Sequence, residues 1–269
     1  MTDQQTFLGL SKTAMYRVDP RLSGNKLVDT DMKQYASKMG FTTAATTEKG
    51  YIAVGSDKGE IRLFDRLGVI AKTSLPSLDS AITGLDVSAD GRYVLATTKN
   101  YLLLIDTLQK DGKYSGKLGF ERSFAKDSKP QPRRLALTPS HVAQFQHETK
   151  VPISFTAAKF NTGPNTEETT IVTSTGPFVV TWSLKKILKG QKDPYSIKRY
   201  VDDVKADNFR FNTDKGIIVA LPNEVDMIMK RSLKRPTRES IAPPRLSADR
   251  RSSARRNYLG RDDIVKSAY

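Results

Sequence analysis

The chain has 269 residues, of which 38% are hydrophobic, and its 44 basic and 29 acidic side chains give a formal net charge of +15. This is enough for one large or two small globular domains, and no apolar run approaches the roughly 18 residues of a membrane-spanning helix. The absence of cysteine excludes disulfides and thiolate metal sites, and the N-terminal sequence has no signal or transit peptide pattern, so we expect a cytoplasmic protein.

Five strands that end in a polar residue recur along the chain. They end at Asp19, Asp65, Asp106, Ser183 and Lys230, at intervals of 46, 41, 77 and 47 residues. Three of these intervals are close to the roughly 40 to 45 residues of a four-stranded propeller blade.

A second repeat lies ahead of these strands. TEKGYIAVG, ADGRYVLAT and TDKGIIVAL each place a glycine in a turn and then begin an apolar strand, and glycine accepts the positive φ that such turns require. Another apolar run precedes each turn, and an outer strand follows, as in IAKTSLP and KLGFERSF. The order predicts an all-β fold, an incomplete β-propeller of about four to five blades that spans residues 1–235.

The long interval indicates an insertion over residues 109–152, which are polar and interrupted by proline. Within it, LTPSHVAQFQHET predicts a short helix with Thr138 as N-cap and Pro139 in the first turn. A second short helix is expected from Ser183 to Gly190, after Trp182.

Residues 236–269 predict a basic disordered tail, because they are rich in proline, serine and arginine. Residues 230–269 hold 12 of the 44 basic side chains and 4 of the 29 acidic ones, which is over half of the net charge. We expect no DNA binding by the folded part, whose aromatic residues fall at strand positions typical of core packing. The tail is either a solvated segment or an interaction arm that binds an acidic partner and is phosphorylated by kinases. The candidate contacts for the partner are Arg250, Arg251, Arg255 and Arg256, and the candidate phosphorylation sites are Ser247, Ser252 and Ser253.

Catalysis is not expected from the sequence, and we expect no cofactor or metal. His141 and His147 are the only histidines, and their spacing of six places them on different faces of the inserted helix, which we interpret as solvated surface. The adjacent pairs 167–168 and 202–203 are carboxylates that point to opposite faces in extended structure. GSDKG lacks the Gly-Lys-Ser/Thr ending of a phosphate loop.

Two segments, DKGEIRLFD and SADGRYVLAT, resemble WD40 repeats. No blade has the Gly-His dipeptide and only Trp182 represents the tryptophan, so the usual histidine-centred hydrogen-bond network cannot form. Longer phrases, such as ATTEKGYIAVGSDKGEIRLFDRLG, TTIVTSTGPFVVTW and KRPTRESI, resemble the C-terminal WD40-like region of the fungal vacuolar import and degradation family, among the members with a PH-like region ahead of the propeller. That region and the first blades have no counterpart here, so we expect a fragment or a truncated reading frame.

The resemblance implies a non-enzymatic cytoplasmic scaffold that binds proteins and takes part in the glucose-triggered delivery of gluconeogenic enzymes, such as fructose-1,6-bisphosphatase, to the vacuole. The alternative is binding of nucleic acid or an anionic membrane through the tail. Loss of salt-sensitive binding on deletion of residues 236–269 would favour this alternative.

Overall fold

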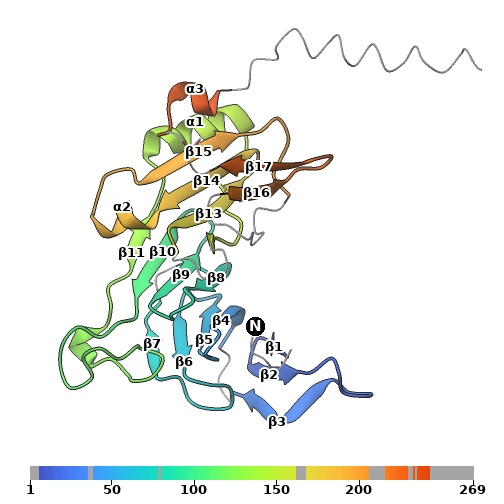
Figure 1. Ribbon diagram of the computed structural model, residues 1–269, viewed down its shortest axis with the longest axis vertical. Coiled ribbons are helices and arrows are strands. Elements are labelled where there is room, and N and C mark those ends of the chain that lie inside the picture. The colour runs from blue at the N-terminus through green and yellow to red at the C-terminus, as the bar shows by residue number, and fades with distance from the viewer. Residues whose placement is uncertain are drawn as a thin grey trace, which may run out of the picture.

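The computed structural model describes residues 6–35, 39–77, 80–161, 168–205, 216–229, 233 and 235–242, which form five antiparallel sheets in succession (Figure 1). Sheet 1 contains β1 (Phe7–Leu10), β2 (Ala14–Val18) and β3 (Leu27–Gln34). Sheet 2 contains β4 (Phe41–Thr46), β5 (Ile52–Ser56), β6 (Ile61–Phe64) and β7 (Thr73–Leu75). Sheet 3 contains β8 (Gly84–Val87), β9 (Tyr93–Thr97), β10 (Leu102–Asp106) and β11 (Arg133–Leu135). Sheet 4 contains β12 (Lys159–Asn161), β13 (Thr170–Thr175), β14 (Phe178–Ser183) and β15 (Tyr195–Arg199), and sheet 5 contains β16 (Gly216–Ala220) and β17 (Val225–Met229).

Each sheet packs against the next through a buried apolar cluster, so the sheets form a serial stack. The innermost strands β4 and β8 contact each other, and β8 also contacts β12. The stack follows an open arc, with sheet 1 at one end and sheet 5 at the other (Figure 1). The structure confirms the all-β, blade-by-blade architecture, with three four-stranded sheets flanked by two smaller ones.

Two of the three recurrent aspartates, Asp19 and Asp106, bond to the turn that follows them. Asp19 Oδ1 accepts from the backbone N–H of Arg21 at 3.0 Å, and Asp106 Oδ1 accepts from that of Leu108 at 3.1 Å. An aspartate in this position stabilises the turn two residues ahead. Two of the three predicted glycine turns are confirmed, since Gly50 and Gly91 have φ values of 83° and 79°. The third turn, at residues 213–215, lies outside the described residues.

One predicted outer strand is wrong. Apart from an isolated bridge between Leu108 and Leu118, KLGFERSF forms no strand. Phe120 and Phe124 are buried from irregular backbone. The outer strand of sheet 3 is β11, which lies inside the range 109–152 that we interpreted as an insertion; β11 pairs with only three residues of β10, too few to show an alternating pattern.

Both predicted helices are present. Helix α1 (Pro139–Thr149) begins after Thr138, whose hydroxyl accepts from the N–H of His141. Helix α2 (Leu184–Leu188) is shorter than expected and follows Ser183, which makes no side-chain capping bond. A one-turn 3₁₀ helix, η1, covers Lys126–Ser128.

A third helix, α3 (Arg238–Ile241), lies within the range assigned to the tail. Its capping box is formed by Thr237 and Ser240, and Ile241 is fully buried in the cluster between sheets 3 and 4. The ordered part of the chain therefore extends at least to this residue. Residues 243–269, with all the candidate residues of the tail, lie outside the described residues.

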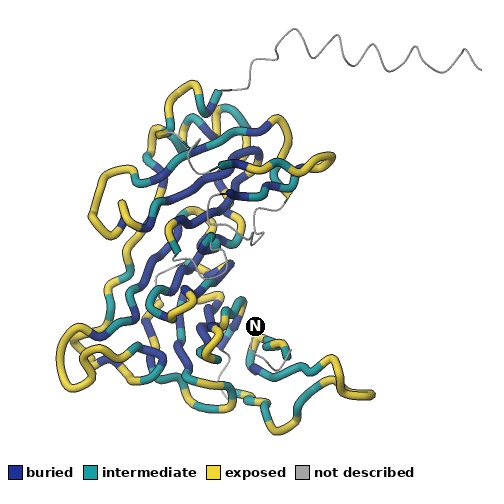
Figure 2. Tube along the Cα trace, viewed as in Figure 1, coloured by how far each residue is buried: buried dark blue, intermediate teal, exposed yellow. Residues whose placement is uncertain are grey.

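The middle of most strands is buried, and the turns are exposed (Figure 2). The predicted core aromatics Phe41, Phe64, Phe155, Phe178 and Trp182 are buried, and Tyr93 is half-buried. Phe209 and Phe211 lie outside the described residues. The indole Nε1 of Trp182 has no hydrogen-bond partner in the described part of the chain, which agrees with the missing histidine network.

Candidate functional site

The two histidines differ in their surroundings. His141 Nδ1 lies 2.7 Å from the Tyr195 hydroxyl, which also accepts from the Thr138 N–H at 3.0 Å. His141 thus joins α1 to β15, and its interpretation as solvated surface is wrong. His147 is solvated, with a side chain that is 78% exposed.

The carboxylate pairs do not form an active site in the described residues. Glu168 Oε1 accepts from the backbone N–H of Ala89 at 2.6 Å and so links sheet 4 to sheet 3, while Glu167 lies outside the described residues. Asp202 and Asp203 are exposed. Within the same residues there is no group of three or more histidine or acidic side chains that could hold a metal ion.

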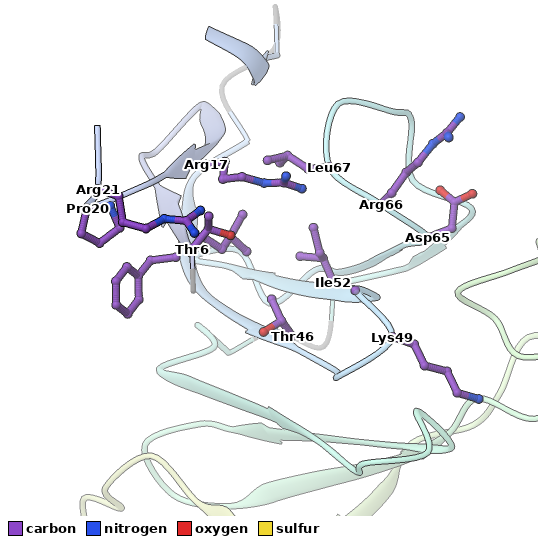
Figure 3. Close-up of a pocket in the computed structure, with 13 residues that line it drawn as sticks. Thr6, Arg17, Pro20, Arg21, Thr46, Lys49, Ile52, Asp65, Arg66 and Leu67 are labelled. Carbon is purple, nitrogen blue, oxygen red and sulfur yellow. The ribbon is translucent and has the colours of Figure 1, made fainter. Parts of the chain in front are cut away.

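A cleft of about 680 Å³ lies between sheets 1 and 2 (Figure 3). It is built from the start of β1, the end of β2 with the turn after it, the β4–β5 turn and the turn after β6. Its apolar lining comes from Phe7, Leu8, Ile52 and Leu67. Its charged lining comes from Arg17, Arg21, Lys49, Asp65 and Arg66.

The strand register of β1 and β2 places Arg17 in the cleft. Leu8 of β1 pairs with Arg17 of β2, so the two side chains share one face of sheet 1. Leu8 packs against the cluster between sheets 1 and 2, so this face is turned toward sheet 2. Arg17 Nη1 lies 2.9 Å from Asp31 Oδ2, and this ion pair fixes the guanidinium over β3.

Arg21 is held in place by Asp19, one of the recurrent aspartates. The Nε and Nη2 groups of Arg21 donate to Asp19 at 2.9 and 2.8 Å. These bonds, together with the backbone N–H of Arg21, lower the pKa of Asp19 to about 2. Asp19 therefore stays ionised at any physiological pH, and Arg21 keeps a fixed orientation at the edge of the cleft.

The two cleft cations that come from sheet 2, Lys49 and Arg66, form no such ion pair in the described residues. Both side chains are exposed. Asp65 Oδ2 lies 3.5 Å from Lys72 Nζ, and its buried Oδ1 has no hydrogen-bond partner among the described residues. Even with Asp19 and Asp31 counted, the cleft has an excess of positive charge, which attracts anionic groups.

The inner edge of β1 adjoins the cleft. In the described residues β1 pairs only with β2, just as the innermost strands β4 and β8 pair only with β5 and β9. Unpaired backbone groups along a strand edge can accept an additional strand. The cleft therefore offers an apolar floor, cations and free backbone groups together.

A second cleft, of about 700 Å³, lies beside β9, β10, η1 and β11. Its lining is more polar than that of the first cleft, and two of its cations are already paired, since Asp106 lies 3.6 Å from Arg92 and 3.5 Å from Lys110. Asp111, Asp127, Lys129 and Arg133 add further charges of both signs. We therefore consider the first cleft the stronger candidate.

The cations of the cleft were not predicted as site residues from the sequence. Arg21 and Arg66 each follow a recurrent aspartate, Asp19 and Asp65, by one or two positions. Because equivalent turns of neighbouring blades lie on the same rim, this spacing was a usable signal for two of the cations. Arg17 and Lys49 have no comparable signal.

Comparison with known proteins places this fold among WD40-like domains. The family model described as the VID27 C-terminal WD40-like domain matches residues 1–247. Two proteins named vacuolar import and degradation protein 27 are similar to this chain. The one from Schizosaccharomyces pombe is 59% identical over 244 residues, and the one from Saccharomyces cerevisiae is 46% identical over 247 residues.

The alignments cover 91% and 90% of this chain but only 30% and 32% of those proteins, so the chain spans about a third of their length. Among solved structures, the crystal structure of the Myceliophteria thermophila Cps50 (Swd1) β-propeller domain matches with a TM-score of 0.54 and 10% identity. The match covers 85% of this chain and 64% of that one. At this identity, the likeness shows the propeller fold alone.

Proposed function

Because the chain belongs to the family of the VID27 C-terminal WD40-like domain, we propose that it is a non-enzymatic scaffold that binds a partner protein during vacuolar import and degradation. We propose that it acts in the cytoplasm. The names of its relatives support the pathway, and the serial stack of sheets supports the scaffold role, because packed blades hold their connecting turns in place at little entropic cost.

The observation that carries this proposal is the cleft between sheets 1 and 2. Its volume of about 680 Å³ and its mixed apolar and cationic lining suit the capture of a protein segment. His141, the best acid–base candidate of the chain, hydrogen-bonds to Tyr195 between α1 and β15, away from the residues that line the cleft. Binding therefore fits the cleft better than catalysis.

The cargo of this scaffold is, in our proposal, a gluconeogenic enzyme such as fructose-1,6-bisphosphatase. To test it, the chain replaces the matching third of the Saccharomyces cerevisiae relative, and loss of fructose-1,6-bisphosphatase is followed after glucose is added. The native graft should restore turnover of the enzyme. A graft with Phe7→Asp and Lys49→Glu, both at exposed positions of the cleft, should slow it.

The matched control graft carries Ile70→Asp and Lys185→Glu, which are exposed positions outside the cleft. It should behave like the native graft. A native graft that is stable in the cell and yet restores no turnover would contradict the proposed role. Equal turnover by the cleft graft and the native graft would contradict the proposed site.

A second candidate function, binding of nucleic acid or an anionic membrane, rests on the positive charge of residues 230–269. Because Ile241 is buried in the fold, a deletion that tests the tail should begin after Ala242. Salt-sensitive binding to RNA or to acidic lipid that survives deletion of residues 243–269 would rule out this tail segment as the binding site. Phosphomimetic changes at Ser247, Ser252 and Ser253 should weaken the same binding.

A further inference from the structure

We propose that the cleft between sheets 1 and 2 binds an acidic segment of the partner protein, in extended conformation, with an apolar side chain inserted between the sheets. The inference rests on the proposed function and adds the chemistry of the partner to it. Three features of the cleft carry it: the apolar floor, the placement of the cations and the free edge of β1.

The floor of the cleft takes an apolar anchor. Leu8 and Leu67 are half-buried, Ile52 is buried beneath them, and Phe7 is 58% exposed at the mouth. Apolar surface that stays in contact with water gains free energy when a ligand covers it. An aliphatic side chain of the partner would cover Leu8 and Leu67 and fill the space between the two sheets.

The cations lie on both sides of this floor. Arg17 and Arg21 come from sheet 1, and Lys49 and Arg66 come from sheet 2 (Figure 3). Lys49 and Arg66 have no ion pair in the described part of the chain. Arg21 uses Nε and Nη2 on Asp19, so the Nη1 donors of its guanidinium remain for a ligand.

The spread of charge favours separate carboxylates over a single phosphate group. A phosphate needs donors that converge on one point, whereas these cations are distributed over two sheets (Figure 3). Asp65 also lines the cleft and would repel a dianion placed beside Arg66. Carboxylates that alternate with apolar residues along a peptide can meet the cations and the floor at the same time.

The extended conformation follows from β1. Its inner edge is unpaired in the described residues, and Thr6, Phe7 and Leu8 line the cleft. A peptide that adds to such an edge gains backbone hydrogen bonds, while its alternate side chains provide specificity. The acidic segment is therefore placed along β1, with its side chains directed alternately into the cleft and away from it.

The test uses a fluorescein-labelled peptide of alternating glutamate and leucine, whose anisotropy is followed as the full chain is added. We expect saturable binding that weakens with salt. Lys49→Glu together with Arg66→Glu should reduce the affinity about tenfold, through loss of two attractions and gain of two repulsions. Both residues are exposed and form no ion pair with a described residue, so folding of this variant should be unchanged.

The matched control is Lys185→Glu together with Lys186→Glu, an equal change of charge on exposed residues of α2, and it should bind as the native chain does. Peptides with glutamine for glutamate, or serine for leucine, should bind more weakly. Hydrogen exchange of the β1 amides should slow when the acidic peptide is bound.

Equal weakening by the two double variants would overturn the proposal, because the attraction would then be nonspecific. Equal binding of the glutamine peptide, or phosphatidylserine vesicles that displace the acidic peptide and bind more tightly, would also overturn it. If the peptide does not bind but the cleft graft still slows enzyme turnover, the proposal of an acidic segment is overturned and the proposed function stays intact. Peptide binding by a chain whose graft restores no turnover would contradict the proposed function instead.

Discussion

Tyr51 shows how one side chain attaches the long connection after β10 to the stack. Its hydroxyl donates to Glu121 Oε1 at 2.7 Å, and its ring stacks on Phe120 with centroids 5.3 Å apart. Burial, with a further contribution from the bond to Glu121, raises the pKa of Tyr51 to about 12. The same bond is the main cause of the lowered pKa of Glu121.

This pair predicts a loss of stability in alkali. Between about pH 10 and pH 12, Tyr51 ionises in the unfolded chain but keeps its proton in the folded one. The unfolded state then binds fewer protons, so the free energy of unfolding falls as pH rises through this window. Tyr51→Phe should make that fall shallower and should cost about 1 kcal/mol at neutral pH.

Urea unfolding followed by the fluorescence of Trp182, the single tryptophan, measures both effects. Tyr114→Phe is the control, because the Tyr114 side chain is 38% exposed. The same pH slope in Tyr51→Phe and in the native chain would show that the Tyr51 hydroxyl does not carry the effect.

The candidate site could be predicted only in part from single residues. The turn after each recurrent aspartate is visible in the sequence, and it carries Arg21 and Arg66. The cleft itself depends on the wedge between two packed sheets and on the pairing of Leu8 with Arg17. Both are tertiary features, so no local pattern marks them.

At the scale of the element, the sequence predicts the strands that are followed by, or end in, a polar residue. β10 ends in Asp106, which bonds to the next turn, and β6 is followed directly by Asp65, which faces Lys72; these contacts are local. The outer strand β11 was not predictable, because only three residues pair and its position depends on β10. In KLGFERSF, Phe120 and Phe124 are buried without being in a strand, so an apolar pattern suggested the wrong element.

An aromatic contact packs helix α1 against β14. Phe145 is 1% exposed and stacks on the buried Phe178, with ring centroids 4.0 Å apart and an interplanar angle of 7°. Phe145→Ala should lower the free energy of unfolding by about 3 to 5 kcal/mol, through lost burial and the cavity that remains. Chemical denaturation measures the loss.

The exposed Gln146→Ala in the same helix is the matched control and should change stability by less than about 0.5 kcal/mol. A loss from Phe145→Ala as small as that of the control would mean that α1 docks without its aromatic contact.

At the scale of the whole molecule, sheet 5 lies at one end of the arc, and no other described sheet packs on its outer face. Strand alternation buries Ile228 toward sheet 4 and directs Val225 and Met227 to the opposite face, where they are 70% and 51% exposed. β17 pairs only with β16 in the described residues, so its outer edge has no partner there. An apolar face beside an open strand edge promotes association between chains.

We therefore expect the isolated chain to associate as its concentration rises. Val225→Lys together with Met227→Lys should reduce this association, because two cations on this outer face repel a second apolar surface and cost free energy to bury. Sedimentation velocity or light scattering over a range of concentrations measures the change. The matched control, Ile70→Lys with Val201→Lys, alters two apolar residues that are 79% and 71% exposed outside the strands, and it should leave association unchanged. A native chain that stays monomeric at every concentration, or a control pair that reduces association equally, would show that the open end of the arc is not the surface through which the chains meet.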